Sequence, residues 1–258
     1  MDLGIKGRVA LITGGSRGLG RQAALALCSE GCKVAICARS AEGLNETVEE
    51  MKGLGHEVIG VQADVATIEG TEGFYQKSMK TFGKVDIIVN NVGGTRGGRD
   101  FDTITDQDWQ DTLDLNLLSA VRLTRLGLPG MKERRWGRIV NIASIWGREF
   151  GGGLTYMTAK AALIAFSKHM AISLAPYNVL VNTLAPGSIQ FPGGGWERFV
   201  NGNSEEVVQE FIARQLPMGK FGWPEPVGAM IAFLCSERAD LITGTSINVD
   251  GGQSRSLI

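Results

Sequence analysis

The sequence lacks the features that would mark a nucleic-acid-binding, membrane or secreted protein. Its 26 Lys and Arg residues and 27 Asp and Glu residues give a formal net charge of -1, with no long run of one sign. This balance gives no electrostatic reason to bind nucleic acid or an anionic membrane. No apolar run is long enough to span a bilayer. The N-terminal stretch is interrupted by Lys6 and Arg8 and does not look like a signal peptide. We expect a cytoplasmic protein whose partner is a small molecule.

Cysteine is scarce and is not spaced for metal binding. The four cysteines form no CxxC pair, and each lies in a segment that we expect to be buried. Small buried thiols are typical of a protein in a reducing compartment. We predict no metal site, and we interpret all four thiols as core residues: Cys28, Cys32, Cys37 and Cys235.

Length and pattern favour one α/β domain over residues 1–258. With 43% hydrophobic residues, the chain can build a substantial core. Strand-like apolar runs alternate with helix-length segments, which is the signature of βαβ units. We predict a single-domain, doubly wound Rossmann-like parallel sheet of about seven strands with helices on both faces. The expected strands are RVALIT (8–13), KVAICA (33–38), EVIGVQA (57–63), VDIIVN (85–90), GRIVNIA (137–143), NVLVNTLA (178–185) and SINV (246–249).

One long glycine-dense stretch, from Ala185 to Asn203, looks irregular. An irregular segment of this length in a compact domain is usually functional or disordered, and we interpret it as part of a mobile lid over about residues 187–222. Trp146 and Trp196 would give a substrate pocket aromatic walls, or would serve only packing.

A glycine-rich turn follows the first expected strand. TGGSRGLG (13–20) leads into the helix-like RQAALALCSEG, and Gly14, Gly18 and Gly20 give the spacing GxxxGxG. Glycines let the backbone approach a pyrophosphate, which the N–H groups of the following helix then stabilise. The place of this turn between a strand and a helix predicts a dinucleotide site, with a tight turn that binds no ligand as the alternative.

The end of the second expected strand bears on the choice of cofactor. Ala38 stands where an acid would accept the ribose 2′-hydroxyl of NAD, and Arg39 follows it. Arg17, in the glycine turn, would reach the same place. Because arginine accommodates the 2′-phosphate of NADP, we predict NADP (NADPH) in preference to NAD. The alternative is that both arginines are solvated surface side chains.

Tyr156 and Lys160 lie four residues apart in TYMTAK, which continues as the helix-like AALIAFSKHMAISLA. Residues i and i+4 share one face of a helix. The ammonium of Lys160 would lower the pKa of the Tyr156 phenol toward neutrality and make it a usable proton donor. The alternative is that the pair only makes one helix face partly polar and has no catalytic role.

Five motifs occur in one order: TGGSRGLG, NNVGG (90–94), IVNIAS (139–144), YMTAK (156–160) and NTLAPG (182–187). On this ordered set the sequence resembles the short-chain dehydrogenase/reductase family over essentially its whole length. The resemblance implies that Tyr156 is the general acid/base, that Lys160 lowers its pKa and binds the nicotinamide ribose, and that Ser144 orients the substrate carbonyl. It also implies that Asn116 holds a water in the proton relay. Val92 replaces the usual alanine, which should change packing slightly.

The resemblance also implies that Asp64 contacts the adenine region and that Asn90 and its neighbours line the cofactor. Together with the glycine turn and the two arginines, these residues complete a predicted cofactor-binding set: Gly14, Ser16, Arg17, Gly18, Leu19, Gly20, Arg39, Asp64, Val65, Asn91, Gly93, Tyr156, Lys160, Pro186, Gly187 and Ile189.

The predicted function is NADP(H)-dependent hydride transfer between the nicotinamide and a ketone or secondary alcohol, in the form of a carbonyl reductase. The sequence also resembles 3-oxoacyl thioester reductases in MKERRWGRIVNIAS and LITGTSINVDGG. Those enzymes typically dock an acyl carrier protein on basic residues. Arg135 fits one such position, but Tyr177, after Pro176, occupies the other, where we expect no cation. Docking is therefore in doubt.

A non-catalytic nucleotide-sensing protein is the alternative from another class. It would have little reason to keep Asn116, Ser144, Tyr156 and Lys160 together, and their joint presence favours an enzyme. Three arginines would meet an anionic substrate group unless they face solvent: Arg96, Arg99 and Arg148.

The helices around Asn116 and Tyr156 carry apolar residues on more than one face, which is more than packing on one sheet requires. The family resemblance points to a homotetramer with two-fold axes. The residues of this apolar excess are Leu113, Leu117, Val121, Leu163, Phe166 and Met170.

Overall fold

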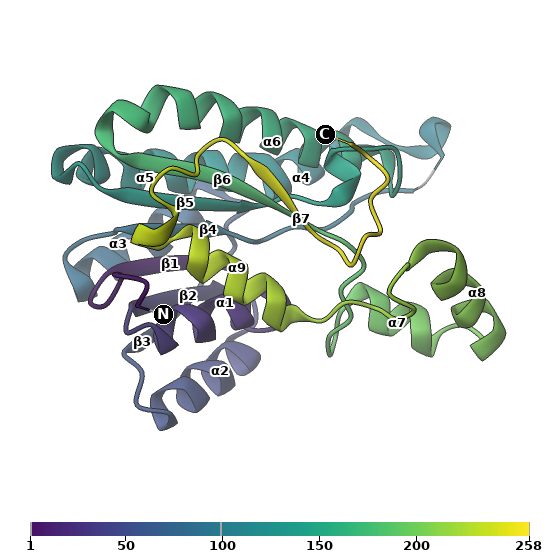
Figure 1. Ribbon diagram of the computed structural model, residues 1–258, viewed down its shortest axis with the longest axis horizontal. Helices are drawn as coiled ribbons and strands as arrows, with labels where there is room; N and C mark the ends of the chain where they lie inside the picture. The colour runs from purple at the N-terminus through teal and green to yellow at the C-terminus, as the bar shows by residue number, and fades with distance from the viewer. Residues whose placement is uncertain (1, 99, 258) are drawn as a thin grey trace.

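The computed structural model describes residues 2–98 and 100–257. In these residues seven strands form one parallel sheet in the order β3-β2-β1-β4-β5-β6-β7 (Figure 1). Every predicted strand is confirmed, with ends that differ by at most two residues. The strands are β1 (Val9–Thr13), β2 (Lys33–Ala38), β3 (Val58–Gln62), β4 (Ile87–Asn90), β5 (Gly137–Ile142), β6 (Val179–Pro186) and β7 (Ser246–Val249).

Helices cover both faces of the sheet, as the doubly wound prediction requires. One layer consists of α1, α2 and α9, and the opposite layer of α3, α5 and α6. The helices are α1 (Gly18–Ser29), α2 (Ala41–Gly53), α3 (Ile68–Phe82), α4 (Asp106–Leu113), α5 (Ser119–Arg134), α6 (Leu154–Leu174), α7 (Gly195–Asn201), α8 (Glu205–Gln215) and α9 (Pro224–Leu234). The 3₁₀ turns are η1 (Phe101–Thr103), η3 (Ile145–Gly147), η4 (Ala175–Tyr177) and η5 (Glu237–Ala239), and η2 (Asp114–Leu118) is a π-helical turn.

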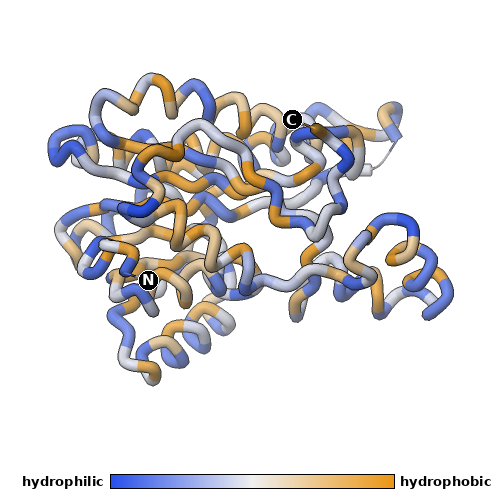
Figure 2. The backbone as a smooth tube through the Cα atoms, in the orientation of Figure 1, coloured by the Kyte–Doolittle hydropathy of each residue, from blue (hydrophilic) through white to orange (hydrophobic). Residues whose placement is uncertain are grey.

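Strand β1 shows how the sequence builds both layers at once. Ala10 and Ile12 pack in the cluster that contains α1 and α9, whereas Val9 and Leu11 pack in the cluster that contains α3 and α5. Because both faces are covered, all of β1 is buried and appears in the sequence as a continuous apolar run. Figure 2 shows the same distribution, with hydrophobic segments concentrated along the strands between the helical layers.

All strands of the parallel sheet end at one edge, and the predicted site residues lie there. The chain runs outward from β1 to β3 and then crosses back to β4, so that the strand order reverses between β1 and β4. The crevice at such a switch point is where ligands bind in open α/β sheets. The glycine turn after β1 and the NNVGG segment at the end of β4 form its two sides.

Helices α7 and α8 form a unit that projects from the end of the main body (Figure 1). The stretch 185–203 is therefore not wholly irregular as predicted, because it contains α7. The glycines before α7 and its length of seven residues hide the helix from a periodicity argument. The unit has its own small core: Val208, Leu216 and Phe221, packed with Trp196, Phe199, Val200, Phe211 and Ile212. Its role as a lid stays a prediction.

The cysteines are buried and unpaired, as predicted. Burial raises the pKa of Cys37 to about 12, so that the thiol stays protonated at neutral pH. Among the described residues no group of three or more His, Cys, Asp or Glu side chains is placed to hold a metal ion. In the same part of the chain, no helix is both long and apolar enough to cross a membrane.

Candidate active site

The glycine turn leads from β1 into α1 and leaves the start of that helix uncapped. The N-cap residue, Arg17, makes no side-chain capping bond, and the first turn of α1 carries no acidic residue. Gly14 and Gly18 have φ angles of 70° and 54°, a conformation that favours glycine. A Cβ on Gly20 would lie 2.2 Å from the Gly14 carbonyl oxygen. The turn therefore forms a cradle that side chains would fill, beside free N–H groups that suit a pyrophosphate.

Thr13 and Asn91 tie the glycine turn to the end of β4. The hydroxyl of Thr13 accepts from the N–H of Asn91 at 2.9 Å and from the N–H of Val92 at 3.1 Å. Asn91 Nδ2 donates to the Thr13 carbonyl at 2.8 Å. The glycine turn and the NNVGG segment, which form the two sides of the switch point, are thus held together by hydrogen bonds. The sequence prediction omits Thr13, although its place at the strand end before the first glycine is the available signal.

Asn116 and Lys160 meet at Gly93. A Cβ on Gly93 would lie 2.8 Å from Lys160 Nζ and 2.9 Å from Asn116 Oδ1. Asn116 also makes two hydrogen bonds to the backbone of Gly94. Its Oδ1 accepts from the Gly94 N–H at 3.0 Å, and its Nδ2 donates to the Gly94 carbonyl at 2.8 Å. Both side chains are buried. The NNVGG segment therefore needs its first glycine to pass over these two residues.

Asn116 lies in η2, where the helix widens between α4 and α5. Turns of this π type are frequent at functional sites. The wide turn lets Asn116 Nδ2 donate to the carbonyl of Thr112 at 2.8 Å while its other contacts reach Gly94. The sequence does not reveal the widening, because the residues on either side have an ordinary helical pattern.

Ser144 and Tyr156 face each other across the end of β5 and the first turn of α6. Ser144 lies close enough to the Tyr156 phenol to lower its pKa, and Ser144 Oγ accepts from the N–H of Trp146 at 3.2 Å. Lys160 lies one turn further along α6, with Nζ 5.5 Å from the centre of the Tyr156 ring. The same Nζ donates to the Ile142 carbonyl at 2.8 Å. Together with the contact at Gly93, these distances bring all four predicted catalytic residues to one place.

Burial dominates the electrostatics of the Tyr156 and Lys160 pair. It raises the pKa of Tyr156 to about 12, against a smaller lowering by the hydrogen bond from Ser144, and it lowers the pKa of Lys160 to about 7. The predicted lowering of the Tyr156 pKa by Lys160 is therefore wrong for the chain by itself, because desolvation penalises both charged forms. At neutral pH the phenol is protonated, which is the form that a proton donor requires.

Trp146 and Trp196 join the α7–α8 unit to the predicted catalytic residues. Trp146 follows Ser144 by two residues, and its ring centre lies 6.3 Å from that of Trp196 in α7. Trp196 also contacts Phe211 at 4.9 Å and Phe221 at 5.4 Å between ring centres. The two tryptophans predicted as pocket walls therefore contact each other and link the aromatic core of the unit to the neighbourhood of Ser144.

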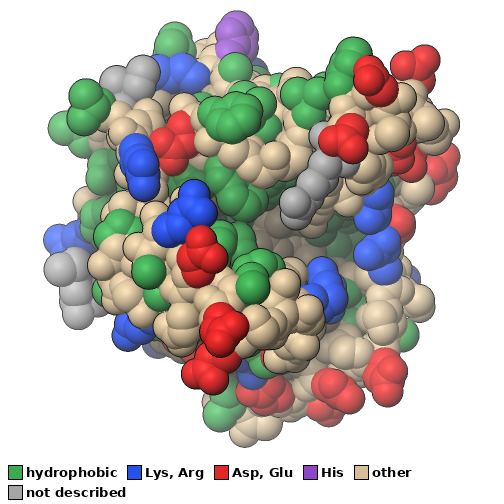
Figure 3. Space-filling view, turned by 90° about the vertical axis from the view of Figure 1, so that its right-hand side faces the viewer, with side chains coloured by type: hydrophobic (Ala, Val, Ile, Leu, Met, Phe, Trp, Pro, Cys, Tyr) green, Lys and Arg blue, Asp and Glu red, His purple; other side chains and the backbone are tan. Residues whose placement is uncertain are grey.

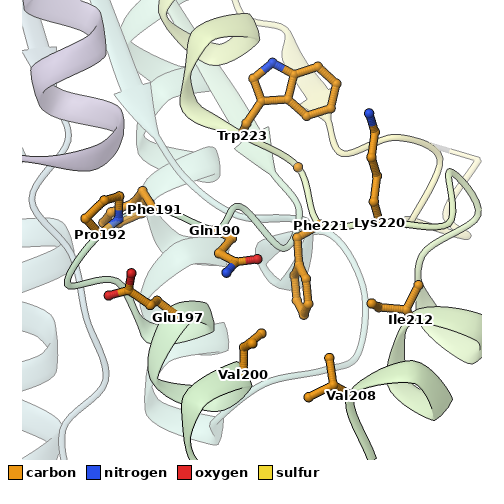
Figure 4. A pocket seen from close by; sticks show the side chains of 11 residues that line it. Gln190, Phe191, Pro192, Glu197, Val200, Val208, Ile212, Lys220, Phe221 and Trp223 are labelled. Carbon is orange, nitrogen blue, oxygen red and sulfur yellow. The ribbon is translucent and has the colours of Figure 1, made fainter. Parts of the chain in front are cut away.

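A cavity of about 550 Å³ opens along the same unit. In Figure 4 the side chains of Val200, Val208 and Phe221 converge in it. None of the four predicted catalytic residues lines it. Figure 3, which views the end of the molecule that carries α7 and α8, shows a hollow near the middle of this face.

The two arginines predicted to hold a 2′-phosphate are both exposed, but they point to different neighbours. Arg39 follows β2, and its carbonyl accepts from Gln62 Nε2 at 3.0 Å. Arg17 extends toward the segment before α7, since its Nη1 would lie 2.8 Å from a Cβ on Gly193. Arg39 is therefore the better placed of the two for the ribose end of β2. The carboxylate of Asp64, predicted to contact the adenine region, accepts from the N–H of Ala66 at 3.0 Å.

Three arginines were predicted to meet an anionic substrate. The side chain of Arg148 instead donates from Nη1 to the Ser246 carbonyl. This bond ties the η3 turn to β7. Arg96 is exposed on the loop after NNVGG, where its carbonyl accepts from Thr155 Oγ1 at 3.3 Å. Arg99 lies outside the described residues.

Position 177 carries no cation, as the sequence shows, but a lysine from α5 lies beside it. Lys132 Nζ, from the last turn of α5, lies 4.7 Å from the centre of the Tyr177 ring. Arg135 lies beside it and donates from Nη2 to the Pro176 carbonyl at 3.0 Å. Lys132 and Tyr177 are far apart in the sequence, so that a position-by-position alignment does not show that the lysine fills this place.

Comparison with known proteins finds similarity over most of the chain. The family model described as short chain dehydrogenase matches residues 8–194. The chain is 39% identical over 254 residues to a 3-oxoacyl-(acyl-carrier-protein) reductase of Aquifex aeolicus, covering 98% of this chain and 99% of that protein. Both the glycine turn and the Tyr156 to Lys160 segment fall inside these matches.

Two solved structures extend the comparison to bound cofactors. An L-sorbose reductase from Gluconobacter frateurii, complexed with NADPH and L-sorbose, superposes with a TM-score of 0.93 at 34% identity, covering 100% of both chains. A 7α-hydroxysteroid dehydrogenase complexed with NADH and 7-oxo glycochenodeoxycholic acid superposes with a TM-score of 0.89 at 28% identity, covering 100% of this chain and 98% of that one. The similar proteins thus include complexes with each of the two nicotinamide cofactors.

Proposed function

We propose that this chain, which belongs to the short-chain dehydrogenase/reductase family and is an oxidoreductase of ketone and alcohol substrates, is an NADPH-dependent carbonyl reductase. The observation that carries the proposal is the meeting of the buried residues Asn116, Ser144 and Lys160 around Tyr156, beside an uncapped glycine turn. The test is consumption of NADPH in the presence of ketones.

The chain's own residues supply the groups that a carbonyl reduction needs. The bound nicotinamide would supply a hydride to the carbonyl carbon. Ser144 and Tyr156 face each other, and a carbonyl oxygen beside them can accept from both hydroxyls while negative charge develops on it. Tyr156 then donates its proton to that oxygen. The ammonium of Lys160 stabilises the phenolate that remains.

The residues at the switch point fit a dinucleotide. The cradle at Gly14, Gly18 and Gly20 and the free N–H groups of α1 would hold the pyrophosphate. Lys160, beside Gly93, would bind the nicotinamide ribose. At the other end, the absence of an acid at Ala38 and the exposed Arg39 favour a 2′-phosphate, and therefore NADPH.

Reduction of a ketone should slow as the pH rises through about 7. The pKa of Lys160 is lowered to about 7, so that its ammonium form, which stabilises the developing phenolate, is lost above that pH. Tyr156 stays protonated throughout this window, because its pKa is about 12. The measurement is kcat/KM for one ketone as a function of pH. A rate that rises with pH across the window would contradict the assigned role of Lys160.

A 3-oxoacyl thioester carried by an acyl carrier protein is the second candidate substrate. Lys132 and Arg135 form a basic pair beside Tyr177, which supports docking of an acidic carrier. The similarity to the Aquifex aeolicus reductase favours the same candidate. Free 3-oxoacyl esters in the substrate panel test the chemistry without the carrier.

We propose that the enzyme is a homotetramer. Leu163 does not belong to the apolar excess named in the sequence prediction, because it is buried in its own chain. Leu117, Val121 and Phe166 are only partly buried, and Ile172 in α6 is 69% exposed, so that apolar surface remains for a partner subunit. Light scattering at micromolar concentration should give about four times the chain mass of 27.6 kDa. A mass of one chain would refute the tetramer.

A further inference from the structure

The ring of Phe191 lies on the α-carbon of Gly18. A Cβ on Gly18 would lie 2.5 Å from Cε2 and 2.6 Å from Cζ of this ring. Gly18 is the first residue of α1, and Phe191 belongs to the segment that leads from β6 to α7. An aromatic side chain from the α7–α8 side of the molecule therefore covers the glycine turn.

Phe191 is fixed by the backbone on either side of it. The N–H of Gln190 donates to the Gly222 carbonyl at 2.9 Å, and the N–H of Gly194 donates to the Phe191 carbonyl at 2.9 Å. The segment touches the glycine turn a second time, where the guanidinium of Arg17 lies against Gly193. The position of the ring is thus set by a short, hydrogen-bonded strap (residues 188–194) and not by the ring alone.

The N–H groups at the start of α1, beside the ring, are available to an anion. The first-turn N–H groups of α1 have no side-chain cap, and that turn carries no acidic residue. The carboxylate of Glu197 accepts from the N–H of Gly193 at 2.7 Å, and Arg198 Nη1 donates to the Gly193 carbonyl at 2.8 Å. The strap therefore places the Phe191 ring next to the free N–H groups of α1, and the guanidinium of Arg17 lies nearby against Gly193.

We propose that Phe191 is a cofactor-binding residue whose ring forms the strap-side wall of the pyrophosphate subsite. This inference rests on the proposed dinucleotide function. A ring in this place excludes water from the bonds between the α1 N–H groups and the phosphates, and a lower local dielectric strengthens such bonds. NADPH and NADH share the pyrophosphate, so that Phe191 acts equally on both, whereas Arg39 acts only on NADPH.

The test is a pair of binding titrations, following the fluorescence of NADPH and of NADH without any substrate. Phe191→Ala should weaken both cofactors by about tenfold, and Phe191→Leu, which keeps apolar cover, by less. Arg39→Leu should weaken NADPH only. Val207→Ala is the matched control in the α7–α8 unit, because Val207 is 44% exposed and lies in α8, away from the strap; it should bind both cofactors as the wild type does.

The outcomes distinguish a failure of the Phe191 inference from a failure of the proposed dinucleotide function. If Phe191→Ala binds both cofactors as tightly as the wild type, or more tightly, the ring is not a wall and the inference is overturned, although the proposed function stands. Loss of NADPH binding alone would place Phe191 at the 2′-phosphate and would also overturn it. If the wild type binds neither cofactor, the proposed function fails and the inference fails with it. Should the Ala variant not fold, Phe191→Leu decides by the same criteria.

Discussion

Turnover of Tyr156→Phe should fall by at least about a hundredfold, while its affinity for NADPH stays nearly unchanged. The substitution removes the hydroxyl that faces Ser144 and keeps the ring beside Lys160. A proton donor is lost, but the glycine turn that would hold the cofactor is untouched. Steady-state turnover and a fluorescence titration with NADPH measure the two quantities separately.

Tyr75→Phe is the matched control for this variant. Tyr75 lies in α3 and packs at the edge of a core cluster on the opposite face from the glycine turn, so that its hydroxyl has no part in the proposed chemistry. Its variant should turn over as the wild type does. If Tyr156→Phe also retained most of its turnover, the role of Tyr156 as proton donor would be wrong.

The double change Ala38→Asp with Arg39→Leu should reverse the preference in kcat/KM from NADPH to NADH. A charge-assisted bond from Arg39 to the 2′-phosphate is worth about 1.5 to 3 kcal/mol, so that its loss weakens NADPH by roughly ten- to a hundredfold. The new carboxylate at position 38 adds an acceptor for the ribose 2′-hydroxyl and repels the phosphate. Paired steady-state titrations with one shared ketone measure the reversal.

The choice of Arg39 for this change follows from the structure. Arg17 points toward Gly193, whereas Arg39 lies at the end of β2 beside Gln62. Arg125→Leu serves as the control for loss of a surface cation, because Arg125 is exposed on α5 and should leave the preference unchanged. A wild type that already prefers NADH would show that the end of β2 was misinterpreted.

The sheet was predictable because burial on both faces of a strand produces a recognisable sequence pattern. In β1 every residue is buried, and the strand is therefore an unbroken apolar run. Helix α7 produces no comparable sequence pattern. It has seven residues, begins at Gly195, and buries none of its residues fully. A short helix with no fully buried residue produces no periodicity to detect.

The candidate catalytic residues could be named from ordered motifs, but their pKa shifts could not. Lys160 lies beside Tyr156 on one helix face, as the spacing predicts, yet its pKa depends on how β5 and the NNVGG segment enclose it. The same limit applies to contacts between distant segments. Neither Lys132 over Tyr177 nor Phe191 on Gly18 leaves a local pattern, because each pair is brought together only by the fold.

The most direct test of the proposed carbonyl reductase is the loss of nicotinamide absorbance when the wild-type enzyme is mixed with NADPH and a panel of ketones. The panel contains free 3-oxoacyl esters, diketones, aryl ketones and sugars. We expect steady oxidation of NADPH with at least one of these ketones, faster than with NADH at the same concentration. Binding of NADPH without oxidation by any member of the panel, and without the reverse oxidation of the corresponding alcohols by NADP, would contradict the account.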